Sequence, residues 1–222
     1  GLGLALAEWM IGEGAGRVVV SGRSDTDEKV RIAMDRLNSD AVRLETVVAD
    51  VTSRDDMAVL IDRLSDDALP LRGVIHAAGV LRDSFLPFLT PELIGEVCDA
   101  KITGGWLLHE LTRDLPLDHF ICLSSVTALL GTPGQAAYAG ANGGLDALAR
   151  LRSGEGLPAL SLQLGPMADL GMTAGGAVAD RDLAALGMTP LRTQTFFDGV
   201  VKVWETGKPV AALAAFDAVK WT

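Results

Sequence analysis

The chain has 222 residues and a mass of 23.2 kDa, which is the size of one large α/β domain. Hydrophobic residues make up 49% and charged residues 22%, a balance typical of folded globular proteins rather than disordered ones. The net charge of −10 and the lack of a lysine and arginine cluster argue against nucleic acid or an anionic membrane as a partner.

Short β-branched runs alternate with longer stretches of helical periodicity. In chain order, the sequence predicts helices over 4–11, 27–37, 54–64, 91–109, 135–152 and 193–205, with strands over 17–21, 44–49, 74–77, 120–123, 160–164 and 210–216 between them. The strands are mostly continuous apolar runs, as expected for strands covered on both faces. The alternation predicts an α/β fold with a doubly wound parallel sheet.

One strand is missing from this pattern. The chain opens on Gly1-Leu2-Gly3 and continues directly into a helix, whereas a doubly wound sheet has a strand before that turn. We expect either that another segment supplies this strand or that the chain was cut from a larger polypeptide. No repeat or low-complexity linker divides the chain, so a single domain over 1–222 is expected.

Small or polar residues follow successive predicted strands. Gly1 and Gly3 resemble the end of a phosphate-binding glycine turn, although a plain glycine turn fits equally well. Arg23 follows strand 17–21, and an arginine there in place of an acid favours a 2′-phosphate, hence NADPH over NADH. Its alternative is a solvent-exposed loop arginine. Asp50 and the run Ala77-Ala78-Gly79 end the next two strands, where small residues let a flat ring approach the backbone.

A hydroxyl, a phenol and an amine stand out further along the chain. Tyr138, the only tyrosine, opens the predicted helix 135–152, with Asn142 one turn later on the same face. Ser125 follows strand 120–123, so hydroxyl and phenol can converge on one carbonyl oxygen. The alternative is a surface tyrosine and a turn serine.

Lys101 lies on the apolar stripe of the predicted helix 91–109, which also holds Ile94, Val97, Gly105 and Leu108. Burying an ammonium group is costly unless it is paired or functional. Lys101 is therefore a candidate catalytic group, and the alternative is that its ammonium reaches solvent at the rim of the helix.

The remaining reactive side chains exclude several classes of site. Cys98 and Cys122 are too few for a disulfide framework or a four-ligand metal site, and the three histidines are not spaced as ligands. No apolar stretch approaches the ~18 residues of a membrane span. We expect no metal, no membrane span and a reducing, cytoplasmic setting.

The stretch from Phe120 to Ala149, which contains Ser125, Tyr138 and Asn142, resembles the ketoreductase domains of polyketide synthases, in the short-chain dehydrogenase/reductase superfamily. The runs 76–81, 101–112 and 216–221 match the same family in order and spacing, so the resemblance covers essentially the whole chain. Its most specific feature is a lysine upstream of the tyrosine, with asparagine four residues after it. Most other short-chain reductases have lysine there.

The resemblance implies a catalytic tetrad of Ser125, Tyr138, Lys101 and Asn142. In that family NADPH reduces a β-ketoacyl thioester, presented by an acyl carrier protein, to the β-hydroxyacyl thioester. Tyr138 would protonate the oxygen, Ser125 would donate a second hydrogen bond, Lys101 would lower the pKa of the phenol, and Asn142 would order a water or backbone group.

The resemblance also assigns cofactor contacts. Gly1 and Gly3 match the end of the glycine turn, Arg23 the reader of the 2′-phosphate, and Asp50 with Val51 the adenine contacts. Together with Ala77, Ala78 and Gly79, they form the expected NADPH site. The missing strand is a departure from the family pattern, and it leaves NADPH binding by this chain open.

Three features bear on stereochemistry. Leu81-Arg82-Asp83 resembles the Leu-Asp-Asp signature of B-type reductases, which give the D-hydroxy product, and it keeps the final Asp83. Leu130 stands where A-type domains carry tryptophan, whereas Gly140 replaces a proline of some B-type domains. We expect B-type reduction.

Met167 and Met172 lie in the glycine-rich segment 165–179, predicted to be a mobile lid over the acyl chain. The alternative is a loose loop.

Two other functions compete with this prediction. A non-reducing, ketoreductase-like scaffold or epimerase domain would usually lose the tyrosine, the serine or the glycine turn, and only the turn is shortened here. A free-standing reductase of small ketones is disfavoured by the lysine-before-tyrosine order. The expected partners are the acyl carrier protein and neighbouring synthase domains.

Overall fold

A computed structural model describes residues 1–24, 28–39, 41–65, 69–170, 187–217 and 220. Its helices are α1 (Leu2–Gly12), α2 (Glu28–Leu37), α3 (Arg54–Ser65), η1 (Leu86–Phe88), α4 (Pro91–Cys98), η2 (Asp99–Thr103), α5 (Gly104–Thr112), α6 (Thr127–Leu130), α7 (Ala136–Gly154) and α9 (Thr193–Glu205). Its strands are β1 (Arg17–Gly22), β2 (Arg43–Val48), β3 (Gly73–His76), β4 (His119–Ser125), β5 (Leu160–Leu164), β6 (Met188–Thr189), β7 (Val210–Leu213) and β8 (Ala215–Phe216). The predicted alternation of strands and helices is confirmed.

The parallel strands form two sheets. One holds four strands in the order β3-β4-β5-β7, and the other holds β1 and β2, while β6 and β8 form a small antiparallel pair. A doubly wound sheet has one more strand between β1 and β3, and the described residues contain no strand at that place. The predicted strand over 210–216 is divided into β7 and β8, which belong to different sheets.

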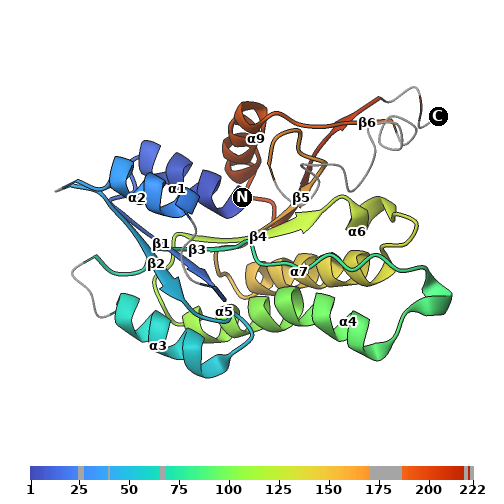
Figure 1. The fold of residues 1–222 in the computed structure, drawn as a ribbon, viewed down its shortest axis with the longest axis horizontal. Coiled ribbons are helices and arrows are strands. Elements are labelled where there is room, and N and C mark those ends of the chain that lie inside the picture. Colours follow the sequence, from blue (N-terminus) through green and yellow to red (C-terminus); the bar gives the residue numbers. More distant parts are fainter. Residues whose placement is uncertain (25–27, 40, 66–68, 171–186, 218–219, 221–222) are drawn as a thin grey trace.

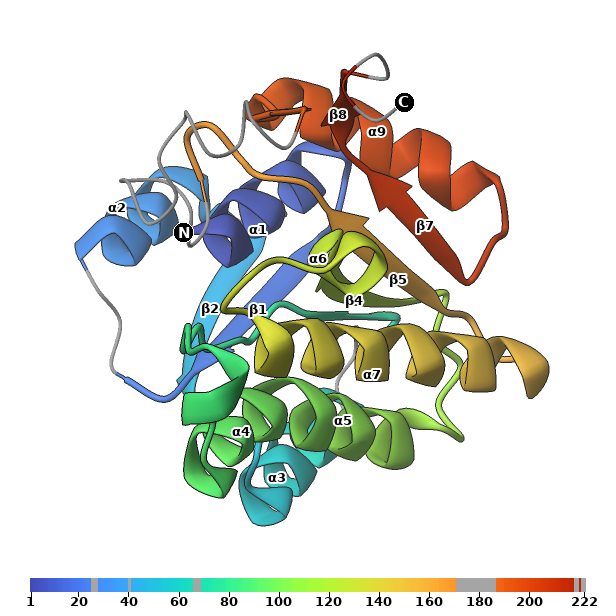
Figure 2. The same cartoon turned by 90° about the vertical axis from the view of Figure 1, so that its right-hand side faces the viewer.

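Helices cover both faces of the parallel strands (Figures 1 and 2). α1, α2 and α9 lie on one face, and α3, α5 and α7 lie on the other. The alternation of side chains along β4 follows these layers: Ile121 and Leu123 pack into the core beneath α1 and α9, whereas Phe120 and Cys122 pack into the core beneath α3, α5 and α7. Both faces are therefore buried, as the continuous apolar runs predicted.

Side chains cap the starts of two helices. Thr90 precedes Pro91, and its hydroxyl accepts a hydrogen bond from the Leu93 amide at 3.3 Å. Ser53 accepts from the Asp56 amide at 3.2 Å at the start of α3.

The predicted helix over 91–109 is not continuous. α4 ends at Cys98, a π-helical turn follows over Asp99–Thr103, and α5 begins at Gly104. π-Helical turns inside α-helices occur frequently at functional sites. This turn contains Lys101.

Within the described ranges, no helix is both long and apolar enough to cross a bilayer. The same part of the chain holds no group of three or more His, Cys, Asp or Glu side chains arranged to bind a metal ion.

Candidate active site

Lys101 is buried beside Tyr138. Only 3% of Lys101 is exposed, and its Nζ donates to the backbone carbonyl of Leu123 at 2.9 Å. The same Nζ lies 5.5 Å from the centroid of the Tyr138 ring. The ammonium group therefore points towards the phenol and not towards solvent. The alternative of an ammonium at the rim of the helix does not hold.

The predicted apolar stripe around Lys101 is buried only in part. Val97, Gly105 and Leu108 are buried, but 41% of Ile94 is exposed. Ile94 and Val97 both lie in α4, ahead of the π-helical turn, so the buried part of the predicted stripe begins at Val97.

Ser125 and Asn142 flank the phenol from two elements. Ser125 ends β4, where its Oγ donates to the Thr127 hydroxyl at 3.1 Å and accepts from the Thr127 amide at 3.2 Å. Asn142 is fully buried in α7, and its Nδ2 donates to the Tyr138 carbonyl at 2.7 Å. Its Oδ1 is buried without a hydrogen-bond partner among the described residues, which is unusual for a polar atom.

Burial shifts the pKa values of the amine and the phenol in opposite senses. It lowers the pKa of Lys101 to about 8, and electrostatic interactions with Cys122 and Asp146 oppose that change only in part. It raises the pKa of Tyr138 above its usual value, and the side chains of Asn142 and Ser125 only partly counter the rise.

Contrary to the expectation from the sequence, the pKa of Tyr138 does not fall below its usual value, because burial outweighs the groups that lower it. At neutral pH the site holds an ammonium group beside a phenol that keeps its proton. This pair is suited to proton donation.

The run Ala77-Ala78-Gly79 follows β3 and borders the same amine. A Cβ added to Gly79 would lie 3.1 Å from Cε and 3.4 Å from Nζ of Lys101. A side chain at this position would press on the end of Lys101, so glycine allows the close approach. Ala77 is exposed, and Ala78 and Gly79 are half-buried, so the backbone of this run is accessible beside the amine.

Arg23 and Asp50 follow the neighbouring strands β1 and β2. Arg23 is exposed, and Asp50 accepts from the Thr52 amide at 2.9 Å and from the Thr52 hydroxyl at 2.8 Å. These two hydrogen bonds are the largest contributions that lower the pKa of Asp50, and the charge of Arg23 adds to them. The two side chains therefore lie near each other, as expected for neighbouring strand ends.

The other predicted cofactor contacts differ in how far the structure constrains them. Val51 packs against α5, because a Cβ at Gly104 would lie only 2.9 Å from its Cγ1. Gly1 and Gly3 lie at the start of α1, and a Cβ at either would meet nothing within 4 Å.

Asp83 is linked to the start of α7. Its carboxylate accepts hydrogen bonds from Nε2 of Gln135 at 3.1 and 3.3 Å, and the Ser84 amide donates to the Gly134 carbonyl at 2.7 Å. Leu130 is half-buried at the end of α6, the helix that follows Ser125.

Met167 is buried in the structure. It is 6% exposed and belongs to the core cluster beneath α1 and α9, together with Leu164 and Phe196. A position of Met167 over the acyl chain stays a prediction. Met172 and residues 171–179 of the predicted lid lie outside the described residues.

Two buried polar residues next to Lys101 have contacts that the sequence did not predict. The Nε2 of His76 donates to the Lys101 carbonyl at 3.0 Å and so holds the π-helical turn. Asp146 lies one turn after Asn142 in α7. The spacing of 138, 142 and 146 would have placed it on the face of Tyr138.

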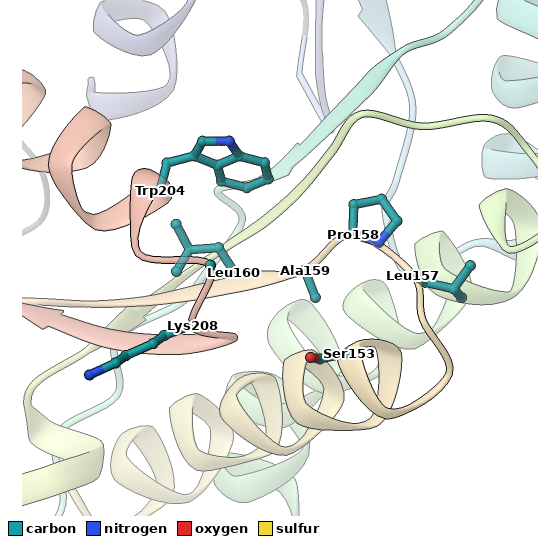
Figure 3. A pocket seen from close by; sticks show the side chains of 8 residues that line it. Ser153, Leu157, Pro158, Ala159, Leu160, Trp204 and Lys208 are labelled. Atoms are coloured by element: carbon teal, nitrogen blue, oxygen red, sulfur yellow. The ribbon is translucent and has the colours of Figure 1, made fainter.

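A pocket elsewhere in the molecule is separate from this cluster (Figure 3). Its lining side chains come from the end of α7, the start of β5 and the end of α9, and they include Ser153, Pro158, Leu160, Trp204 and Lys208. It lies at the amino end of β5, whereas Ser125 ends β4 at its carboxyl end. Ligands of open α/β sheets bind at the carboxyl ends of strands.

Comparison with known families agrees with this arrangement. The family model for the KR domain matches residues 1–169. The chain belongs to the ketoreductase (KR) domain family.

Relatives of this KR domain are parts of polyketide synthases. One protein of the phenolphthiocerol/phthiocerol polyketide synthase of Mycobacterium tuberculosis is 40% identical over 171 residues, which cover 77% of this chain and 8% of that protein. The chain therefore spans only a small part of this curated relative.

Solved KR structures share the fold over nearly the whole chain. An A-type ketoreductase from a modular polyketide synthase superposes with a TM-score of 0.90 at 33% identity, covering 98% of this chain and 46% of the other. The ketoreductase from the first module of phoslactomycin biosynthesis in Streptomyces sp. HK803 gives 0.89 at 31%, covering 100% and 52%. The match confirms the Rossmann-like fold of this KR domain.

Proposed function

We propose that this KR domain is an NADPH-dependent reductase that converts a β-ketoacyl thioester, held on an acyl carrier protein, to the β-hydroxyacyl thioester. The domain would act within a multidomain synthase in the cytoplasm, next to the domains that extend and process the same chain. The observation that carries the proposal is the buried Lys101 ammonium directed at the only phenol of the chain.

The residues present fit the cofactor. Gly79 leaves the backbone open beside Lys101, and the exposed Arg23 lies near Asp50, where it is available to a 2′-phosphate. Arg23, Asp50, Val51 and the run Ala77-Ala78-Gly79 would hold NADPH, with Gly1 and Gly3 near its pyrophosphate. When bound, the nicotinamide supplies the hydride that reduces the β-carbon.

Tyr138 and Ser125 act on the carbonyl oxygen. As that oxygen gains negative charge, the Tyr138 hydroxyl gives it a proton, and the Ser125 hydroxyl donates a second hydrogen bond. The raised pKa of Tyr138 keeps the proton on the phenol until it is needed.

Lys101 and Asn142 support the phenol. The Lys101 ammonium stabilises the phenolate that forms when the proton leaves. Asn142 holds the backbone of Tyr138, and its unpaired Oδ1 is the acceptor available to order a water that resupplies the proton.

We also propose B-type reduction with a D-hydroxy product. The contact between Asp83 and Gln135 fixes the loop after β3 against the start of α7, beside Tyr138. Chiral analysis of the reduced product tests this proposal, and an L-hydroxy product would refute it.

Two measurements test the reductase function. Fluorescence titration with NADPH should detect binding that weakens in Arg23→Ala but not in Arg31→Ala, a control at an exposed arginine of α2. Reduction of a β-ketoacyl thioester should stop in Tyr138→Phe while NADPH binding remains. No NADPH binding by the wild type would favour a scaffold domain, and equal rates on free ketones would favour a reductase of small ketones.

A further inference from the structure

A second buried charge lies on the same helix face as the phenol. Asp146 is 4% exposed, and its two carboxylate oxygens accept hydrogen bonds from the Ser161 hydroxyl and the Gln163 amide, each at 2.6 Å. Both donors are neutral, so they leave the negative charge uncompensated. A buried charge without an opposite charge nearby is costly.

The register of the sheet places Asp146 over the same strands as the Lys101 amine. Ser161 pairs with Cys122, Leu162 with Leu123 and Gln163 with Ser124, so Ser161 and Gln163 flank the partner of Leu123. Lys101 donates to the Leu123 carbonyl. The Asp146 carboxylate and the Lys101 ammonium therefore both contact one short stretch of the neighbouring strands β4 and β5.

The other titratable groups that face Lys101 are neutral. Burial raises the pKa of the Cys122 thiol on β4 to about 12 and lowers that of His76 on β3 to about 4. Tyr138 on α7 keeps its proton because burial raises its pKa. Among the described residues around Lys101, Asp146 is thus the buried acidic side chain that can balance the ammonium charge.

We propose that Asp146 is a positioning residue of this site, whose buried carboxylate is the counter-charge that keeps Lys101 in its ammonium form. Its importance for reduction rests on the function proposed above, because the charge acts on the substrate only through Tyr138. Ser161 and Gln163 fix the carboxylate so that it does not turn towards solvent.

The direct test is the titration of Lys101 itself, measured without cofactor or substrate. The protein is labelled with ¹³Cε-lysine, and the Lys101 signal is assigned by its loss in Lys101→Met. In the wild type this signal should titrate near pH 8, in line with its lowered pKa. In Asp146→Asn the midpoint should fall by about one pH unit or more.

Two controls separate charge from packing. Ser161→Ala removes a hydrogen bond to the same carboxylate but keeps its charge, so the midpoint should move much less. Asp62→Asn removes an exposed acid on α3 and should leave the midpoint unchanged. An unchanged midpoint in folded Asp146→Asn would overturn the proposal.

A measurement on the wild type covers the case in which Asp146→Asn does not fold. The ¹³Cγ signal of Asp146 should show a step at the pH where Lys101 titrates, and this step should vanish in Lys101→Met. Absence of the step would overturn the proposal. A chain that passes these tests but reduces no thioester would contradict only the proposed function.

Discussion

Two adjacent glycines of α7 differ sharply in their surroundings. A Cβ at Gly143 would meet nothing within 4 Å, whereas a Cβ at Gly144 would lie 2.8 Å from both Cδ1 and Cγ1 of Ile102. Ile102 follows Lys101 in the π-helical turn. Alanine at these two positions therefore tests whether α7 packs tightly against the turn that holds the amine.

The magnitudes follow from helix propensity and packing. Replacing a glycine inside a helix by alanine stabilises a protein by about 0.5–1 kcal/mol, so Gly143→Ala should raise the free energy of unfolding by that amount. Gly144→Ala has the same gain, but overpacking against Ile102 costs about 1–3 kcal/mol. The two variants should therefore differ in stability by about 1–3 kcal/mol.

Urea unfolding followed by far-UV circular dichroism measures this difference. Thermal unfolding should agree, with about 2–4 °C in Tm for each kcal/mol in a domain of this size. The reasoning is refuted if both variants are equally stable, because Ile102 and the π-helical turn would then move aside at no cost.

Three further predictions concern buried polar groups. In steady-state assays, the rate of reduction should fall above about pH 8, where Lys101 loses its proton. Lys101→Met should lose this pH dependence, and its rate should be about 10²-fold or more below that of the wild type. Burial lowers the pKa of His76 from 6.5 to about 4, so the folded protein resists protonation of this imidazole. The free energy of unfolding should therefore fall by up to about 3 kcal/mol as the pH drops from 6.5 to about 4. His76→Gln should lack this decrease when unfolding midpoints are measured against pH. Arg152→Met should lower the free energy of unfolding by about 2–4 kcal/mol, because the buried guanidinium lies 3.8 Å from the Phe120 ring centroid and its Nε donates to the Pro158 carbonyl. A decrease of less than about 0.5 kcal/mol in urea unfolding would contradict that interpretation.

The sequence predicted the layers of the fold well, because strands buried on both faces leave a strong apolar signal. Phe120 to Leu123 form such a run, and the structure buries them between two helix layers. The division of the helix around Lys101 was not predictable, since a π-helical turn leaves no clear mark in residue composition.

The candidate site was predictable where chemistry and spacing coincide. Ser125, Tyr138 and Asn142 stand at fixed offsets along one strand and one helix, and the structure brings Ser125 and Asn142 to the phenol. Asp146 and His76 were missed as site residues because their contacts join segments distant in the sequence. The packing of Met167 against Phe196 depends on such tertiary contacts as well.

Transfer of deuterium from [4-²H]NADPH tests the central claim most directly. The account predicts that the wild-type protein moves deuterium to the β-carbon of a β-ketoacyl thioester, and that Tyr138→Phe binds the cofactor but transfers none. A wild-type product without deuterium, or equal transfer by both proteins, would contradict it.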